Sequence, residues 1–169
     1  IGHNYGCASD QWIGAFERVD AQLGLLRRNL PKGTLMVIVA DPGMITAEPE
    51  CCVDIAADPR LMRGVAKVGG EPRCVMLYAE ADEKAEDIAA RWRETLGERA
   101  QVRTRRQAIE EGVYGQVASY VEPMIGDVIV SSAGATTIVD SRTQTEKAMQ
   151  LPSVHGSRTR LESDIPGLS

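Results

Sequence analysis

The sequence is poor in aromatic side chains: Phe, Trp and Tyr together make up 4% of its 169 residues, and phenylalanine occurs once. A core in this chain must therefore consist mainly of aliphatic side chains, with Trp12, Phe16 and Trp92 as isolated large groups. Such cores are typical of α/β proteins, in which helices and sheets pack in layers. The length and the hydrophobic content of 43% are those of about one globular domain.

Cysteines are also few, and their spacing excludes a disulfide scaffold. Cys7, Cys51, Cys52 and Cys74 include no Cys-x-x-Cys pair, and adjacent Cys51 and Cys52 are not expected to bridge each other. We therefore expect free thiols in a reducing compartment, which favours a cytoplasmic location. Because the sequence starts at Ile1 and not at Met, the lack of a signal peptide at this position is not informative.

Long apolar runs and concentrated positive charge are absent as well. No run reaches the roughly 18 apolar residues that a membrane helix requires, so no membrane partner is expected. The 19 Lys and Arg against 24 Asp and Glu give a net charge of −5. Nucleic acid is not expected as a partner, because phosphate neutralisation requires a concentrated basic surface. The one basic cluster, residues 103–106, is interpreted as a solvated junction between strand and helix, with anion binding as the alternative.

Among the segments that are present, residues 9–30 have the periodicity of a long amphipathic helix. Ser9 is the expected N-cap, and the sequence PKG at 31–33 ends the helix. The apolar positions alternate steps of four and three: Trp12, Phe16, Val19, Leu23, Leu26 and Leu30.

The run Leu35 to Ala40 is apolar without polar alternation, which predicts a strand covered on both faces within an α/β sheet. In open α/β sheets, ligands bind outside the carboxyl ends of such strands. Asp41 follows this strand directly and is therefore a candidate site residue.

Residues 65–140 differ in character and predict a small α+β subdomain, inserted into a unit formed by residues 1–58 and 141–169. VAKVGG and RCVMLYAE predict two strands, DEKAEDIAARWRETLG a helix, AQVRTR a third strand and RRQAIEEG a short helix. DVIVSSA and TTIVDS predict a hairpin around Gly134.

Three side chains with the capacity for metal chemistry, His3, Asp41 and His155, lie at element edges or in loops. Taken singly, each also has a plain structural interpretation, as a chain terminus, a turn former and a loop residue. Their flanking sequences IGHNYGCASDQWIGAFERVDAQLGLL, VIVADPGM and VHGSRTRLESDIPGL occur in this order. Together they resemble the last three sequence blocks of the alkaline phosphatase superfamily, in its nucleotide pyrophosphatase/phosphodiesterase branch. Those blocks read approximately D-x-x-G-H-x-x-G, [STA]-D-H-G-M and H-G-[SG]-x-T-x-x-E-M-x-[VI]-P-L-[LI].

The resemblance implies a partial alkaline-phosphatase-like layered α/β sheet, with residues 65–140 as a variable α+β insertion. It also implies a hydrolase that cleaves phosphate esters, nucleotides among them, with two zinc ions about 3.5 to 4 Å apart and a Thr or Ser nucleophile. By this resemblance His3 and His155 are ligands of one zinc, and Asp41 is a ligand of the other. The remaining motif matches are Gly43, Met44, Thr159, Glu162, Pro166 and Leu168.

The departures from the family pattern bear on activity. The Asp four positions before His3 would precede Ile1, and the nucleophile and the first metal-binding Asp belong to an N-terminal half of the family fold. Pro42 stands where the family has a His, and proline offers no ligand atom, although Pro42 with Gly43 suits a type II turn. We therefore expect zinc binding to be weakened or lost and this chain to be inactive, with exposed core surface that promotes self-association.

Two alternatives remain open at the level of sequence. The chain can instead be a non-catalytic binding or regulatory protein, in which residues 65–140 are the working part. A structural zinc site from His3, Cys7 and the Cys51 and Cys52 pair is a further option, although it lacks recognisable ligand spacing.

Overall fold

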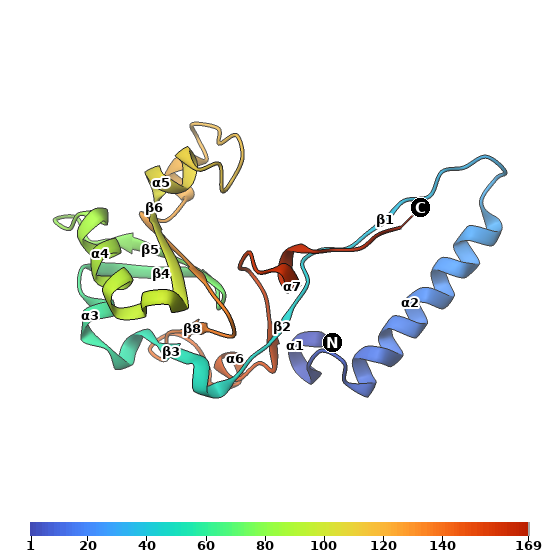
Figure 1. Cartoon of the computed structure of the whole chain (residues 1–169), viewed down its shortest axis with the longest axis horizontal. Helices are drawn as coiled ribbons and strands as arrows, with labels where there is room; N and C mark the ends of the chain where they lie inside the picture. Colours follow the sequence, from blue (N-terminus) through green and yellow to red (C-terminus); the bar gives the residue numbers. More distant parts are fainter. Residues whose placement is uncertain (169) are drawn as a thin grey trace.

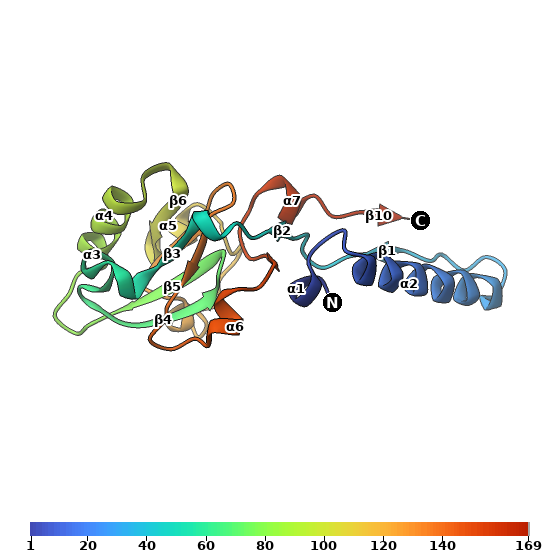
Figure 2. The same cartoon turned by 90° about the horizontal axis from the view of Figure 1, so that it is seen from below.

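In the computed structural model, which describes residues 1–168, a layered α/β body continues into an extended arm (Figure 1). The body comprises residues 48–140. The arm comprises residues 8–40 together with residues 165–168, and it projects away from the body in both views (Figures 1 and 2). The first residues and residues 141–164 lie where the two portions meet.

The body is centred on a four-stranded antiparallel sheet of order β4-β5-β7-β6. Its strands are β4 Val65–Glu71, β5 Cys74–Ala79, β6 Ala100–Thr104 and β7 Val128–Ser132. Side chains alternate between the two faces, as the pleat requires. Val128 and Val130 of β7 belong to the main core on one face, whereas Ile129 belongs to a second cluster with Ala108 and Ile125.

Helix α4 (Ala85–Leu96) covers the main core of the body, as its periodicity predicts. Its buried residues are Ile88, Ala89, Trp92 and Leu96. The indole N–H of Trp92 donates a hydrogen bond of 3.1 Å to the carbonyl of Leu61, so the largest buried side chain leaves no polar atom unsatisfied. The predicted short helix also forms, as α5 (Arg105–Glu110), and a capping box between Thr104 and Gln107 fixes its start.

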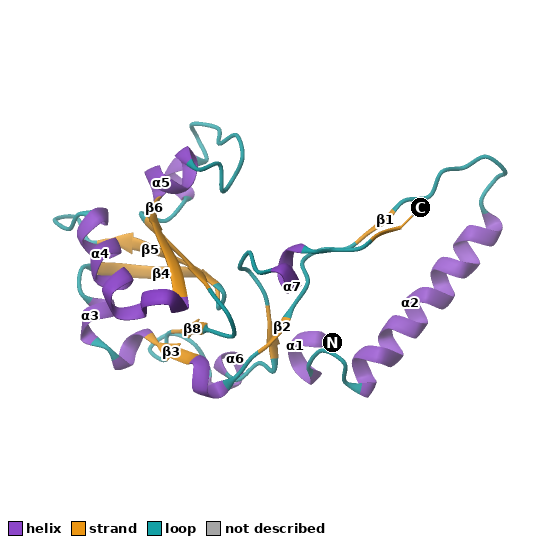
Figure 3. Cartoon of the chain, viewed as in Figure 1, coloured by secondary structure: helices purple, strands orange, loops and turns teal. Residues whose placement is uncertain are grey.

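The remaining body elements are a separate two-stranded ladder, which lies beside the four-stranded sheet (Figure 3), and several short helices. Strand β3 (Cys52–Asp54) pairs in parallel with β8 (Thr137–Val139). The short helices are η1 (Pro49–Cys51), η2 (Ile55–Ala57), α3 (Pro59–Met62), η3 (Gly97–Arg99) and η4 (Glu122–Met124). Ile55 and Leu61 belong to the main core. The division into residues 1–58 with 141–169 and residues 65–140 stays a prediction.

The predicted hairpin around Gly134 is wrong. Strand β7 is buried along its whole length and pairs with β5 and β6, so both of its edges are already occupied. Gly134 adopts a φ of 52°, and the chain turns away from β7 there to pair β8 with β3. The alternation of apolar residues identified both strands but not their partners.

Helix α1 (Gly2–Tyr5) lies where the arm and the body meet, and α2 (Asp10–Asn29) is the long helix of the arm. The predicted helix and its cap are confirmed, since the Ser9 hydroxyl accepts a hydrogen bond from the backbone N–H of Trp12. No residue of Asp10–Asn29 is buried. Within residues 1–168, no helix is both long and apolar enough to cross a membrane. The four cysteines found in this range are free, as expected.

The fully covered strand predicted at Leu35 to Ala40 is wrong in both extent and burial. Only Ile38–Val39 forms a strand, β1, and it pairs with β10 (Gly167–Leu168). Leu35, Val37 and Val39 are all exposed, because within the described chain β10 is the sole strand paired with β1. A second ladder, β2 (Ile45–Thr46) with β9 (Ser153–Val154), lies where arm and body meet, near α6 (Glu146–Met149) and α7 (Arg160–Ser163).

Candidate functional site

The two histidines of the chain lie side by side between the arm and the body. The ring centroids of His3, in α1, and His155, directly after β9, are 5.1 Å apart, and the ring planes are tilted by 51°. Two hydrogen bonds of 2.9 Å attach α1 and the turn after it to β9: His3 Nδ1 donates to the Ser153 carbonyl, and the Cys7 amide donates to the Ser153 hydroxyl. Packing therefore joins two segments that are 150 residues apart.

The hydrogen bond to the Ser153 carbonyl determines which tautomer the neutral His3 ring adopts. A backbone carbonyl can only accept a hydrogen bond, so Nδ1 of His3 must carry the proton. In the neutral ring, Nε2 is then left with its lone pair free. This arrangement is typical of histidines that bind a metal ion through Nε2, because the hydrogen bond made by Nδ1 orients the ring.

Beyond His155, the chain turns sharply toward the body. Gly156 has a φ of 127°, and a Cβ at this position would lie 3.0 Å from Glu71 Cβ and 3.5 Å from Arg73 Cβ. The residue that follows, Ser157, donates its hydroxyl to the Ser132 carbonyl at 2.6 Å. Glycine is thus required here both for backbone conformation and for close approach to the body.

Glu162, on α7, is a buried carboxylate that binds the same loop. Its Oε1 accepts the Ser157 amide at 2.9 Å, and its Oε2 accepts the Thr159 hydroxyl. Arg73 completes the set with a bidentate ion pair. Burial alone would raise the pKa of Glu162, but the hydrogen bonds from Arg73, Thr159 and Ser157 outweigh it and hold the pKa of this carboxyl below its ordinary value.

Asp41 lies in an exposed turn that α7 holds in place. Gly43 donates its amide to the Glu162 carbonyl at 3.0 Å, and a Cβ on Gly43 would lie 1.8 Å from the Leu161 carbonyl oxygen. Only glycine permits this approach. The turn that carries Asp41 and Pro42 is therefore packed against the same helix that carries Glu162.

Of the three predicted metal ligands, the structure brings His3 and His155 together. Within residues 1–168, no three His, Cys, Asp or Glu side chains form a cluster able to hold a metal ion, so Asp41 does not complete such a set. The alternative structural site from His3, Cys7 and the Cys51 and Cys52 pair does not assemble either. The assignment of His3, Asp41 and His155 as ligands stays a prediction.

Sequence reasoning missed Arg73. Its side chain is fully buried at the turn between β4 and β5, where the sequence reads EPRCVMLY. A lone cation immediately before a buried strand was the available signal, because a charge at such a position requires a partner.

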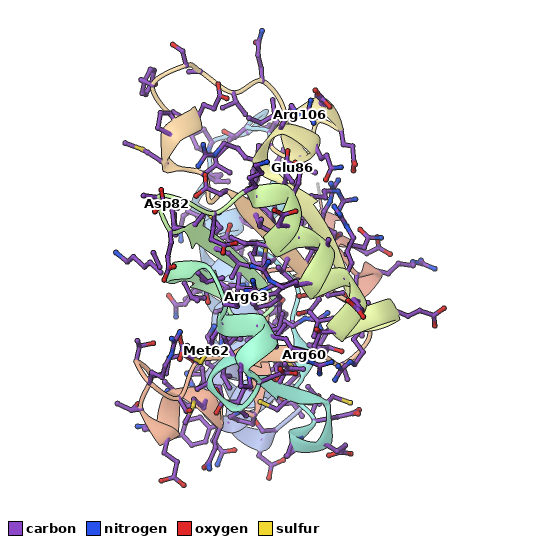
Figure 4. All side chains as sticks on the ribbon, turned by 90° about the vertical axis from the view of Figure 1, so that its left-hand side faces the viewer. Arg60, Met62, Arg63, Asp82, Glu86 and Arg106 are labelled. Carbon is purple, nitrogen blue, oxygen red and sulfur yellow. The ribbon has the colours of Figure 1, made fainter. Side chains whose placement is uncertain are left out.

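The basic cluster at residues 103–106 is a junction between β6 and α5, as interpreted from the sequence. Arg103 pairs with Glu111, and Arg105 Nη2 lies 2.8 Å from Asp127. Figure 4 labels Arg106 and Glu86, whose nearest charged atoms are 4.0 Å apart. Three of the four residues thus have carboxylate neighbours, which does not favour an anion site.

Comparisons with solved structures show that the fold is shared with alkaline-phosphatase-like hydrolases. Human ectonucleotide pyrophosphatase/phosphodiesterase 5 matches with a TM-score of 0.70 and 16% identity, over 98% of this chain and 42% of that chain. The murine protein, solved as an inactive variant in complex with AMP, matches with a TM-score of 0.65 and 15% identity. The match covers 98% of this chain and 42% of that chain. Phosphonoacetate hydrolase from Sinorhizobium meliloti 1021, in complex with phosphonoformate, matches with a TM-score of 0.73 and 19% identity. The match covers 99% of this chain and 43% of that chain. The expected α/β class is confirmed, and the chain spans less than half the length of these relatives.

At the level of sequence, a search of curated proteins found no match. The sequence model of the family described as "Type I phosphodiesterase / nucleotide pyrophosphatase" matches residues 1–158, which is most of the chain. The resemblance noted from the three sequence blocks is thereby confirmed. The chain belongs to the type I phosphodiesterase/nucleotide pyrophosphatase family of the alkaline phosphatase superfamily.

Proposed function

We propose that this chain is the portion of a two-zinc phosphodiesterase or nucleotide pyrophosphatase that supplies His3 and His155 to one zinc ion. The observation that carries the proposal is the pairing of the two rings, 5.1 Å apart, with Nδ1 of His3 bonded to the Ser153 carbonyl. Family membership supplies the reaction class, hydrolysis at phosphorus.

The residues present suit zinc. Neutral imidazoles are preferred zinc ligands, and the Ser153 carbonyl holds His3 in the tautomer that leaves Nε2 free. His155 follows β9, which α1 contacts, so the same strand positions both rings. When bound, the zinc would act as a Lewis acid that polarises a phosphoryl oxygen.

The second zinc site is proposed to be weakened or lost. Asp41 is the candidate ligand, and Pro42 behind it has no side-chain atom able to bind a metal. Two imidazoles supply only two of the roughly four ligands that zinc takes. We therefore propose that these 169 residues alone have no robust hydrolytic activity.

For the substrate class of the whole protein, we propose a phosphate ester or a nucleotide. The support is the family, together with the AMP complex of the murine relative. A phosphonate is the other candidate, since the bacterial relative was solved with phosphonoformate and with phosphonoacetate. Both ligand kinds carry an anionic phosphorus group that zinc can bind.

The test is hydrolysis of an activated phosphodiester, bis(4-nitrophenyl) phosphate, by the purified chain with and without added zinc. The expected result is zinc binding without turnover above that of a His155→Ala control. Robust zinc-dependent turnover would overturn the proposed inactivity. Turnover that persists in the His155→Ala variant would overturn the placement of the site.

A second candidate function is non-catalytic binding or regulation by the body. The observation that favours it is that the body has its own core, with Leu77, Ile88 and Trp92 fully buried. Expression of the body alone, residues 48–140, tests it. The piece carries Arg73→Leu, because Glu162, the ion-pair partner of Arg73, lies outside it. Cooperative unfolding of this piece is expected if the body is an independent module, and a piece without cooperative unfolding would exclude that function.

A further inference from the structure

We propose that Arg73 is a positioning residue, which acts through Glu162 to hold both the His155 loop and the Asp41 turn in place. The inference rests on the proposed function, because it takes these two segments as the carriers of candidate metal ligands. Arg73 itself lies in the body, outside all three sequence blocks that match the family.

The first step is the burial of the pair. Neither the Arg73 nor the Glu162 side chain is exposed to solvent, at 0% each. Arg73 Nε donates to Glu162 Oε1 at 3.1 Å, Nη2 donates to Oε2 at 2.8 Å, and Nη1 donates to the Thr136 carbonyl at 2.5 Å. A planar guanidinium with three fixed acceptors has one orientation, so it defines the position of the carboxylate.

The second step runs from the carboxylate to the His155 loop. Oε1 of Glu162 accepts the Ser157 amide at 2.9 Å, two residues after His155, and Oε2 accepts the Thr159 hydroxyl. Gly156 lies directly against the Arg73 side chain: a Cβ on Gly156 would be 3.5 Å from the Cβ of Arg73. The loop that follows His155 is thus bonded to Glu162 and packed on Arg73.

The third step runs from the backbone of Glu162 to the Asp41 turn. The Glu162 carbonyl accepts the Gly43 amide at 3.0 Å, and the neighbouring Leu161 carbonyl contacts the same glycine. One short helix, α7, therefore binds the candidate ligand segments on two sides. Because Arg73 fixes the side chain of Glu162, the body determines where both segments lie.

The experiment uses the complete chain without metal and exploits its two histidines, whose ring signals are readily assigned by NMR. The main variant, Arg73→Met with Glu162→Met, removes both charges and keeps side chains of similar length. The control is Arg105→Met, which breaks the Arg105 and Asp127 pair in the same body but away from α7. Readouts are the ring signals of His155 and the hydrogen-exchange protection of the Ser157 and Gly43 amides.

In the double variant we expect the His155 signals to shift and the protection of both amides to fall about tenfold, while protection in β5 and β7 persists. The Arg105→Met variant is expected to leave all three readouts unchanged. Unchanged His155, Ser157 and Gly43 signals in a folded double variant would overturn the proposal.

If the double variant does not fold, the single variant Glu162→Gln tests the proposal instead. It keeps the shape of the side chain and removes its charge, so Ser157 protection should fall about threefold with an accompanying His155 shift; no change would overturn the proposal. Zinc is then added to the wild-type sample. Histidine signals that do not change on addition of zinc would reject the proposed function. The positioning role of Arg73 is tested separately, by the metal-free spectra alone.

Discussion

Arg73 and Glu162 form a bidentate ion pair, with bonds of 3.1 and 2.8 Å, in a site where neither side chain is exposed. The two residues are 89 positions apart and connect the turn between β4 and β5 to α7. Removal of one partner of a buried ion pair destabilises the fold by more than the intact pair stabilises it, because the remaining charge stays buried without a partner.

The first prediction concerns this asymmetry. Arg73→Met alone should lower the free energy of unfolding by about 3 to 5 kcal/mol, because the Glu162 carboxylate stays buried and unpaired. Arg73→Met combined with Glu162→Met should lower it by less than the single substitution. Urea unfolding followed by circular dichroism measures both. A double variant as unstable as the single one would contradict the account.

The second prediction concerns pH. Hydrogen bonds hold the pKa of Glu162 below its ordinary value despite burial, so its pKa is lower in the folded chain than in the unfolded chain. As the pH falls below 4.5, the unfolded chain takes up this proton first, and the stabilisation by ionised Glu162 is lost as the pH falls through the folded value.

Comparison with Glu162→Gln isolates this group from the other carboxyls of the chain. The difference in unfolding free energy between wild type and Glu162→Gln should be largest at about pH 6 and shrink toward about pH 3. Urea unfolding at a series of pH values measures it. A difference that is independent of pH would mean that the charge of Glu162 does not stabilise the fold.

The third prediction concerns Gly43. An added Cβ would lie 1.8 Å from the Leu161 carbonyl, so Gly43→Ala should force the Asp41 turn away from α7 and cost about 1 to 3 kcal/mol. Gly167→Ala is the matched control, because a Cβ there meets no described atom within 4 Å. Equal stability losses in the two variants would argue against close packing of the turn on α7.

The fourth prediction concerns the apolar face of α2. Phe16 is 60% exposed and Val19 56% exposed, and we propose that such surface drives self-association of this chain. Phe16→Ser with Val19→Ser should shift sedimentation toward monomer without changing the unfolding free energy of the body. The exposed polar residue Gln22, changed to Ser, is the control. A wild-type chain that sediments as a monomer at high concentration would reject the proposal.

Local patterns in the sequence predicted the three longest helices, α2, α4 and α5, but not the short helices. Helices α2 and α4 follow the apolar periodicity closely, and Ser9 caps α2 as expected, since these signals act between residues three or four apart. The family match was likewise available from three short blocks, because the residues around His3, Asp41 and His155 keep their order.

Long-range relationships were not predictable in the same way. Strands β7 and β8 were both identified, but their partners depend on which sheet edges are free, which no local pattern contains. The exposure of Leu35 and Val39 depends on which strands lie beside β1. The pairing of Arg73 with Glu162 arises only when the body and α7 meet in space.

The most direct test of the central claim, that His3 and His155 share one metal ion, is a zinc titration followed by the ring signals of the two histidines. We predict that the ring signals of both histidines change together at one zinc concentration, and that His155→Ala abolishes the response of His3. Rings that respond at different zinc concentrations, or a His3 response that survives in His155→Ala, would contradict the account.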